Sequence, residues 1–294
     1  MIGRSDDRSA GLDRFNGRVL GVASMHGKEQ VIGPALMARL PLADVIAIPD
    51  LDTDRFGAFS GEVERGTDPR TACLHKARHG AEASGLDLVI ASEGSFGPYP
   101  PAPFISCDEE WLALVDLRDG TELVHRHVSL NTVFGGEDCR SEGEVIAFAA
   151  RMKFPEHQLV LKPTSAWRQG DRVLKGIGDR DTLLQGARIL LPEHGAVWVE
   201  SDLRAMANPT RMRVIGEAAE AFAADLARCC PACDLFHFAI TQALSGLPCG
   251  LCGFPTRSTR AHLRECRGCG HRQEDAREDG KLMEDPTYCD LCNP

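Results

Sequence analysis

The sequence has no long hydrophobic run and no hydrophobic segment near residue 1. None of its apolar stretches approaches the ~18 consecutive residues of a membrane-spanning helix. A secretory signal needs an apolar core of roughly 7–15 residues behind a basic start, whereas residues 1–17 are polar and charged. These absences predict a cytoplasmic protein that does not enter a membrane.

Positive charge is also scarce. The 294 residues carry 33 Lys and Arg against 43 Asp and Glu, which gives a formal net charge of −10. A field of this sign repels nucleic acid. The local exception is a group of five arginines near the C-terminus: Arg257, Arg260, Arg264, Arg267 and Arg272. We interpret this group either as a solvated surface that keeps a small module soluble or as a contact surface for RNA, DNA or an acidic protein partner.

Cysteine, in contrast, is abundant in one place. Eight of the twelve cysteines form four Cys-x-x-Cys pairs within the last 65 residues, namely Cys230/Cys233, Cys249/Cys252, Cys266/Cys269 and Cys289/Cys292. A gap of two residues lets both thiolates of a pair face one tetrahedral ion, and two pairs complete a closed structural zinc site. The four pairs therefore predict two structural zinc ions in a double zinc ribbon over residues 229–294.

The same cysteines allow other interpretations. Disulfides would need an oxidising compartment, and an iron–sulfur cluster remains an alternative to zinc. We favour sequential sharing of the ions, first pair with second and third with fourth, because the gaps of 15 and 19 residues could each hold a hairpin. The 13-residue middle gap also permits nested sharing. Cys229 is interpreted as a spare, and Cys73, Cys107 and Cys139 as small buried hydrophobic residues.

The order of predicted elements favours an α/β fold with a mixed, mostly parallel sheet and helices on its faces. Strands are expected at 18–24, 44–48, 86–91, 159–162 and 196–200, with a hairpin over 111–117 and 121–128. Helices are expected at 30–40, 69–83, 141–152, 179–191 and from 208 to about 229. We expect a disordered segment over residues 1–16, an α/β domain over 17–140, its continuation over 141–228, and the zinc-ribbon module.

Two polar loops are predicted to follow strands, where ligands of α/β sheets bind. In Ser24–Glu29, the combination of Gly27 and Lys28 at a helix start suits an anion, whereas His26 alone is typical of a turn. In Ser92–Pro98, the Glu93-Gly94 pair suits Mg²⁺ binding or general-base chemistry. The alternative is a glycine-rich turn that Ser92 and Glu93 simply cap.

A third polar loop runs from Glu200 to Arg204 and continues into Asn208–Arg211. Asp202 could bind a metal, while Arg204 and Arg211 could bind phosphate in a bidentate manner. An internal network of Asp–Arg salt bridges is the alternative. Acidic residues between 52 and 64 are interpreted mainly as surface, with Asp54 and Arg55 as weak candidates for the site.

Five motifs occur in order along the chain: SMHGKE, DTDRFG, ASEGSFGP, ESDLRAMANPTR and CDLCNP. This combination resembles one family of bacterial proteins whose function is unassigned. The resemblance covers nearly the whole chain and implies a cytoplasmic bacterial protein with a zinc-ribbon tail. It implies no reaction.

Residues 18–134 also resemble the inosine/xanthosine triphosphate pyrophosphatase-like fold. In that fold a first strand ends in Ser/Thr-Asn-Pro-x-Lys and a later strand in Glu-Gly-Gly. Here Ser24–Lys28 and Glu93-Gly94 take these places, and Lys76-Ala77 lies in the matching helix. The first loop is one residue shorter and lacks Asn-Pro, and Ser95 replaces the second glycine. The resemblance implies that Lys28 holds a phosphate and Glu93 a Mg²⁺ ion.

These observations predict a metal-dependent hydrolase or transferase that acts on a nucleotide or another phosphorylated small molecule. The candidate catalytic residues are Lys28, Glu93, Asp202, Arg204 and Arg211. The candidate ligand-binding residues are Ser24, His26, Gly27, Gly94 and Asn208. The alternative is a non-enzymatic adaptor whose zinc ribbons bind nucleic acid or a protein. If the three loops converge on one cleft, the enzyme is favoured. If they are scattered over the surface, the adaptor is favoured.

Overall fold

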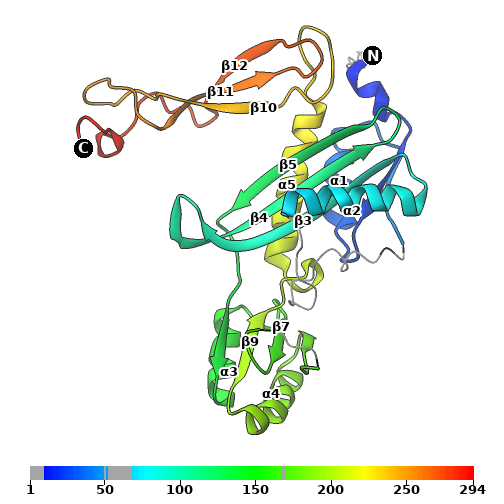
Figure 1. The fold of residues 1–294 in the computed structure, drawn as a ribbon, viewed down its shortest axis with the longest axis vertical. Coiled ribbons are helices and arrows are strands. Elements are labelled where there is room, and N and C mark those ends of the chain that lie inside the picture. Colours follow the sequence, from blue (N-terminus) through cyan, green and yellow to red (C-terminus); the bar gives the residue numbers. More distant parts are fainter. Residues whose placement is uncertain (1–9, 50, 52–67, 167–169) are drawn as a thin grey trace, which may run out of the picture. The chain divides into compact units, whose positions relative to one another are not determined.

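The computed structural model describes residues 10–49, 51, 68–166 and 170–294, which form two compact units (Figure 1). The larger unit comprises Gly17–Ala38 and the described part of Leu42–Phe222. The smaller unit comprises the described part of Met1–Asn16, with Arg39–Pro41 and Ala223–Pro294. Asp54 and Arg55, named above as weak candidates, lie outside the described residues. Within the described residues, no helix has the length and hydropathy needed to cross a membrane.

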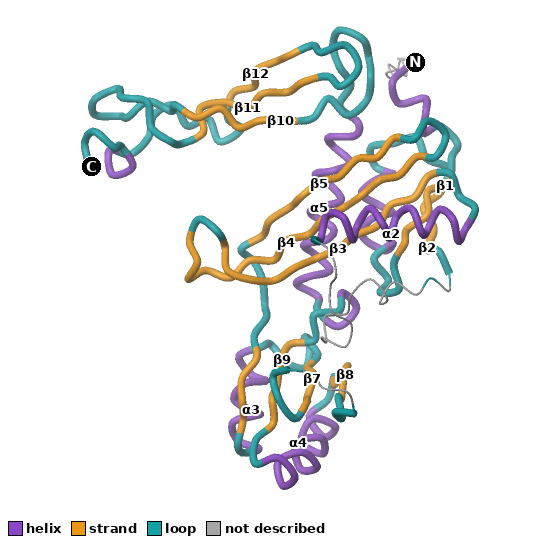
Figure 2. The backbone as a smooth tube through the Cα atoms, viewed as in Figure 1, coloured by secondary structure: helices purple, strands orange, loops and turns teal. Residues whose placement is uncertain are grey.

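The larger unit contains a five-stranded mixed sheet in the order β2-β1-β3-β4-β5 (Figure 2). Its strands are β1 (Val19–Ala23), β2 (Asp44–Ala47), β3 (Leu88–Tyr99), β4 (Ala102–Asp116) and β5 (Thr121–Ser129). β1 pairs in parallel with β2 and β3, whereas β3–β4 and β4–β5 are antiparallel hairpins. The hairpin predicted around Arg118–Gly120 is confirmed.

Helix α2 (Pro69–Ser84) covers one face of this sheet. Asp68 caps its start by accepting a hydrogen bond from the Thr71 N–H at 3.1 Å, and Gly85 ends it with a left-handed φ of 70°. Its apolar side packs on alternate residues of β3 and β4. Because successive strand residues point to opposite faces, the intervening residues face away from α2.

Helices α1 (Glu29–Met37) and α5 (Pro209–Ala227) lie on that second face. The ring of His125 on β5 stacks on Phe222 of α5, with centroids 5.3 Å apart. His125 lies directly across from Leu112 of β4, on the side away from α2. Residues from α1 and α5 are thereby brought close to polar side chains of β3 and β4.

Strand β3 is longer than predicted. The sequence predicts that it ends at Ala91 and that a loop begins at Ser92, but the strand continues to Tyr99 and pairs with β4 throughout. Gly94 is needed for close approach rather than for a turn, since a Cβ there would lie 2.3 Å from Arg211 and 2.5 Å from Glu110. Ser92 and Glu93 are therefore strand residues that point to opposite faces.

A second sheet in the larger unit is fully antiparallel, in the order β6-β9-β7-β8. It consists of β6 (Gly136–Cys139), β7 (Leu159–Lys162), β8 (Leu174–Ile177) and β9 (Val197–Ser201). Helices α3 (Glu142–Arg151) and α4 (Arg180–His194) share one hydrophobic cluster with its strands. Strands β7 and β9 were predicted, whereas the four-residue strands β6 and β8 were not.

The mixed α/β class predicted from the sequence is confirmed. Parallel pairing among the described strands is confined to β1 with β2 and β3. The remaining pairs are antiparallel, because β3, β4 and β5 are joined by hairpins and the second sheet contains no parallel neighbours. Parallel strands are thus fewer than the alternation of strands and helices predicts.

The smaller unit begins with a short 3-10 helix, η1 (Ala10–Phe15). The ring of Phe15 packs edge-on against Phe236 with centroids 5.4 Å apart, and the Gly11 N–H donates to the Asp234 carboxylate at 2.9 Å. Residues 10–15 therefore differ from the disordered segment that the polar sequence predicts, because two apolar side chains, Leu12 and Phe15, are buried. Residues 1–9 lie outside the described residues.

The rest of this unit is a three-stranded antiparallel sheet, β10-β11-β12. Its strands are β10 (Ile240–Ser245), β11 (Thr259–Glu265) and β12 (Arg272–Ala276), followed by a 3-10 turn, η4 (Pro286–Tyr288). Loops and cysteine pairs occupy both ends of this sheet.

Candidate functional site

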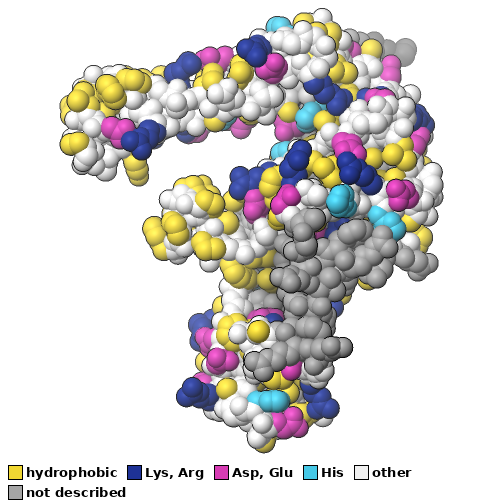
Figure 3. Space-filling model, viewed as in Figure 1, with side chains coloured by type: hydrophobic (Ala, Val, Ile, Leu, Met, Phe, Trp, Pro, Cys, Tyr) yellow, Lys and Arg dark blue, Asp and Glu magenta, His cyan; other side chains and the backbone are white. Residues whose placement is uncertain are grey.

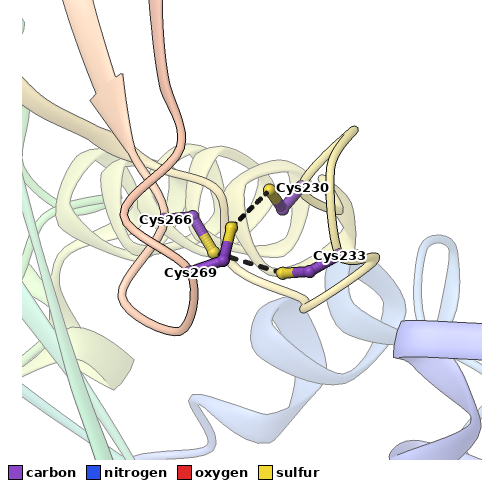
Figure 4. A group of neighbouring side chains, drawn as sticks. All are labelled: Cys230, Cys233, Cys266 and Cys269. Atoms are coloured by element: carbon purple, nitrogen blue, oxygen red, sulfur yellow. Dashed lines mark hydrogen bonds between the residues drawn. The ribbon is translucent and has the colours of Figure 1, made fainter.

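Two groups of four cysteines lie in the smaller unit. Cys230, Cys233, Cys266 and Cys269 form the first group (Figure 4), and Cys249, Cys252, Cys289 and Cys292 form the second. In each group the four Sγ atoms lie within 4.8 Å of one another. Backbone N–H groups of Ala232 and Gly268 donate to Sγ of Cys230 and Cys266, both at 3.4 Å, and so close each pair into a tight turn.

The spacing of the sulfur atoms fits a tetrahedral zinc ion. A Zn–S bond of ~2.3 Å places the sulfurs of a tetrahedron ~3.8 Å apart. The distance is 3.8 Å from Cys230 to Cys269 and 3.6 Å from Cys233 to Cys266. The corresponding distances in the second group are 3.9 and 3.7 Å. Such distances exclude disulfides, whose S–S bond is ~2.05 Å, so both groups could hold metal ions and are consistent with zinc.

The sharing of cysteine pairs differs from both predicted arrangements. The first pair joins the third and the second joins the fourth, so the sequential and the nested predictions are both wrong. The reason is that each gap between pairs contains one strand rather than a hairpin: β10, β11 and β12 in turn. Because the chain reverses direction from each of these antiparallel strands to the next, the first and third pairs lie at one end of the sheet and the second and fourth pairs at the other.

The remaining cysteines lie outside both groups. Cys73, Cys107 and Cys139 are buried, as predicted. Burial is the main reason that the pKa of the Cys73 thiol is raised far above its ordinary value. Cys229 belongs to neither four-cysteine group.

A cavity of about 300 Å³ in the larger unit contains the polar residues that the sequence singles out. Residues following β1, residues of β3 and residues at the end of β9 line it together. Five cationic side chains line the cavity: Lys28, Lys76, Lys175, Arg204 and Arg211. Three acidic ones do so: Glu93, Glu200 and Asp202. The lining therefore carries an excess of positive charge, which favours an anionic ligand.

Lys28 is buried, with 6% of its surface exposed, at the residue before helix α1. Its ammonium group donates a 2.8 Å hydrogen bond to the hydroxyl of Ser92. Among the described residues no carboxylate forms a salt bridge with it. Burial, followed by the positive charge of Arg211 as the next-largest cause, lowers the pKa of Lys28 from 10.5 to about 8.

The pKa of His26 is lowered by burial and by the same positive surroundings. Burial and the neighbouring charges of Lys28 and Arg211 lower its pKa from 6.5 to about 4. The imidazole is therefore neutral at neutral pH and can accept or donate a hydrogen bond without adding charge. It lies in a turn whose Gly27 has a left-handed φ of 68°.

Glu93 forms a buried salt bridge with Lys76 of α2. Both side chains line the cavity, and each is less than a tenth exposed. Lys76 was not predicted as a site residue, although the pyrophosphatase-like resemblance placed it in a corresponding helix. Because the Glu93 carboxylate already neutralises this lysine, it is less available as a metal ligand than the sequence suggests.

Arg211 anchors the α5 side of the cavity and is 1% exposed. Its Nε–H donates to Glu110 of β4 at 2.7 Å. Asn208 holds the start of α5 by accepting a hydrogen bond from the Arg211 N–H at 3.0 Å. Asn208 thus positions the arginine and does not itself line the cavity.

A second carboxyl group lies beside this salt bridge. Asp108 of β4 is fully buried, and its pKa is raised to about 8 mainly by burial and next by the charge of Glu110. Asp108 is therefore largely protonated at neutral pH. The two carboxyl groups stand two residues apart on one face of β4 and share a buried region with Arg211.

Asp202 and Arg204 lie together where β9 ends. The Arg204 guanidinium donates to the Asp202 carboxylate, with a closest distance of 2.5 Å, and Gly176 N–H donates to the same group at 3.1 Å. Asp202 is 2% exposed, whereas the Arg204 side chain is 27% exposed. This pair matches the internal Asp–Arg network considered for the loop, and it also lines the cavity.

The predicted residues thus divide into two sets. Seven of them line the cavity together: Ser24, His26, Lys28, Glu93, Asp202, Arg204 and Arg211. Gly27, Gly94 and Asn208 shape or support it without lining it. The geometry brings the three regions together, while the chemical roles of these residues stay predictions.

Several lining residues were missed by the sequence analysis. Ser201 is 5% exposed, and its Oγ has no hydrogen-bond partner among the described residues. Trp198 and Glu200 also line the cavity, and the indole N–H donates to the Glu200 carboxylate at 2.7 Å. Glu200 and Ser201 lie within the third polar loop that the sequence singles out, although neither was named as a site residue. Trp198 carries no such signal, because it reads as an ordinary strand residue.

The arginines near the C-terminus are largely neutralised by acidic neighbours. Arg260 pairs with Glu274 at 2.6 Å and Arg272 with Glu265 at 3.1 Å. Arg264 is buried and pairs with Asp275 at 2.6 Å. This pairing favours a charged, solvated surface over a nucleic-acid interface.

Residues 76–294 match a family model described as "Domain of unknown function (DUF6671)". The chain belongs to the DUF6671 family. The matched region contains both four-cysteine groups and every cavity residue from Lys76 onward, whereas the Ser24–Lys28 segment precedes it.

Two solved structures show distant likeness to the chain. A PelC variant dodecamer from Paraburkholderia phytofirmans is 12% identical, with a TM-score of 0.21, over 39% of this chain and 73% of that one. A PelC dodecamer from the same organism is 13% identical, with a TM-score of 0.21, over 47% and 84%. Scores this low support no inference. The curated proteins contain no significant match, and no comparison confirms the pyrophosphatase-like fold expected for residues 18–134.

Proposed function

We propose that the cavity binds a nucleotide or another phosphorylated small molecule and catalyses hydrolysis or transfer of its phosphoryl group. One observation carries this proposal: the buried ammonium of Lys28 faces the cavity with a neutral hydroxyl, Ser92, as its hydrogen-bond partner. A buried cation without an acidic partner is costly. A phosphate group would supply the missing negative charge.

The neighbouring residues suit phosphoryl chemistry. Arg204 and Arg211 would join Lys28 in neutralising the charge that develops on phosphoryl oxygens, an effect that is strong where water is excluded. Glu93 or Asp202 could accept a proton from an attacking water or hydroxyl group. The neutral imidazole of His26 would contribute further hydrogen bonds, and so would the Ser201 hydroxyl, which has no partner among the described residues.

A protein-bound Mg²⁺ ion has little support in this arrangement. Glu93 pairs with Lys76, and Asp202 pairs with Arg204. Among the described residues, clusters of three or more His, Cys, Asp or Glu ligands occur only at the cysteine groups. If the reaction uses Mg²⁺, we propose that the ion arrives on the substrate phosphates.

The two four-cysteine groups are assigned a structural role. All four positions around each ion would be filled by sulfur, which leaves no open site for catalysis. We propose that two zinc ions stabilise the smaller unit, which has few buried apolar residues of its own near the cysteines. Thiolate ligands fit a cytoplasmic location, where cysteines stay reduced.

Binding of simple phosphates tests the proposal. We expect orthophosphate, pyrophosphate, ADP or ATP to raise the melting temperature of the zinc-loaded chain, with or without Mg²⁺. Lys28→Met should weaken binding of the same compound by roughly 10–100-fold, because a charge-assisted hydrogen bond is lost. Lys153→Met, which changes an exposed lysine, is the matched control. Unchanged affinity in Lys28→Met would refute the binding site.

Catalysis needs a separate measurement. Any compound that binds should be incubated with the wild-type chain while released orthophosphate is followed. Turnover that persists in both Lys28→Met and Arg211→Lys would show that the cavity is not the site of reaction. Binding without turnover of any bound compound would limit the function to ligand recognition.

A further inference from the structure

Large apolar side chains are exposed around the second four-cysteine group. Six of them have exposed fractions between 43% and 81%: Leu251, Phe254, Leu282, Met283, Tyr288 and Leu291. Figure 3 shows apolar side chains gathered at the end of the sheet that carries the C-terminus in Figure 1. We call these six residues the apolar patch. Exposed apolar clusters of this kind are typical of binding surfaces.

The members of the patch come from segments that the structure holds together. Leu251 and Leu291 each precede the second cysteine of a pair, and the sulfurs of those pairs lie within 4.8 Å of one another. The Gly250 N–H donates to the Glu284 carbonyl at 2.9 Å, which places Met283 beside the same turn. Tyr288 directly precedes Cys289. Four members of the patch, Leu251, Met283, Tyr288 and Leu291, therefore lie on segments that meet at the second four-cysteine group.

The first four-cysteine group provides an internal comparison. The residues that correspond to Leu251 and Leu291 are Ala232 and Gly268. A Cβ built at Gly268 would lie 2.7 Å from Leu235, so this turn is covered by the chain itself. Large apolar residues are thus not required to form a turn that binds metal. Leucine at both turns of the second group needs another explanation.

The charge around the two groups also differs. Residues 246–258 and 277–294, which surround the second group, contain three basic and five acidic side chains, an excess of two negative charges. Residues 228–239 and 264–273, around the first group, contain four basic and two acidic side chains, an excess of two positive charges. Four thiolates around one Zn²⁺ add a formal charge of −2 to each end. The end with the patch is therefore strongly acidic.

We propose that the apolar patch docks a basic amphipathic peptide segment of a partner protein. The apolar side of such a segment would cover Leu251, Leu291 and their neighbours, and its Lys and Arg residues would face the acidic surroundings. A second copy of this chain is disfavoured, because it would bring the same acidic surface into contact with itself. Nucleic acid is disfavoured for the same reason of charge.

Selection from a random peptide library on phage tests the proposal without knowledge of the partner. The target is the full zinc-loaded chain, with counter-selection against the double variant Leu251→Ala, Leu291→Gly, which copies the first group. Enriched peptides should combine several apolar residues with excess Lys and Arg. We expect their affinity for the double variant to fall by roughly tenfold or more, and to fall as salt rises.

The controls separate docking from misfolding. The double variant keeps all eight cysteines and should retain two zinc ions, as measured by elemental analysis. Leu117→Ala changes an exposed leucine in the hairpin of the larger unit and should bind the peptides normally. Enrichment of acidic peptides, or of none that depend on the two leucines, overturns the proposal. The proposal is also overturned if the wild-type chain forms a dimer in sedimentation experiments and the double variant does not.

Discussion

The ammonium of Lys28 donates to the hydroxyl of Ser92 at 2.8 Å, in a buried place where most neighbouring cations have carboxylate partners. Lys76 pairs with Glu93, Arg211 with Glu110 and Arg204 with Asp202. Lys28 thus differs from these three cavity cations, because no described carboxylate forms a salt bridge with it. The cost of holding it charged is reflected in its pKa of about 8.

Replacing Lys28 with methionine should stabilise the ligand-free protein. The pKa of Lys28 falls from 10.5 to about 8 on folding, so below pH 8 the charged lysine destabilises the folded state. Lys28→Met should therefore raise the unfolding free energy by about 1–3 kcal/mol at pH 7. Between pH 8 and 10.5 the unfolded chain binds more protons than the folded one, so the wild type becomes more stable as pH rises.

Urea unfolding at pH 7 and pH 10 measures this effect. The advantage of Lys28→Met over the wild type should shrink at the higher pH, while Lys153→Met should follow the wild type at both. An advantage that stays constant across this range would contradict the lowered pKa of Lys28.

Asp108 should produce the opposite pH dependence. Its pKa is raised from 3.8 to about 8 by burial and by Glu110, so between these values the folded state holds a proton that the unfolded chain has released. Stability should therefore fall as pH rises from about 4 to 8, on the order of 1 kcal/mol per pH unit. Asp108→Asn, which keeps the neutral shape without the proton, should flatten that slope.

Unfolding curves recorded between pH 5 and 8 test this expectation. Asp119→Asn, at an exposed turn between β4 and β5, provides the control and should keep the wild-type slope. The same slope in Asp108→Asn as in the wild type would mean that Asp108 is ionised in the folded protein.

Zinc content of double cysteine variants tests the sharing of the pairs. Cys233→Ser with Cys269→Ser removes two ligands from one group, so one zinc ion per chain should remain. Cys233→Ser with Cys252→Ser damages both groups, and tight zinc binding should be lost at each. Sequential sharing would give the reverse pattern, and nested sharing would lose both ions in either variant. Elemental analysis after dialysis against a weak chelator distinguishes the three.

Helices were the most predictable part of the fold, because their ends carry local signals. Asp68-Pro69 and Gly85 bound α2, and Asn208-Pro209 starts α5, with observed limits within two or three residues of those predicted. Capping depends on side chains within a few residues of the helix end. Such interactions are visible in the sequence before any tertiary contact is known.

The cavity was only partly predictable. Loop chemistry identified Lys28 and Asp202, but the partner of Glu93 is Lys76, seventeen residues away on a helix. Gly94 suggested a turn, whereas it allows the backbone of β3 to approach Arg211. Asp108 and Glu110 did carry a signal, since two acids at alternate positions of a strand share a face. That face could not be recognised as buried without knowing where α5 packs.

The order of the cysteine pairs has a consequence for synthesis of the chain. No complete set of four ligands exists until Cys269 has left the ribosome, and the second set must wait for Cys292. Until then the nascent chain exposes its first two pairs together, and these can capture an ion in an arrangement that the finished protein does not keep. An ion captured by the first two pairs would have to change ligands before the observed groups could form, whereas an ion that arrives after Cys269 or Cys292 has emerged would meet a complete group.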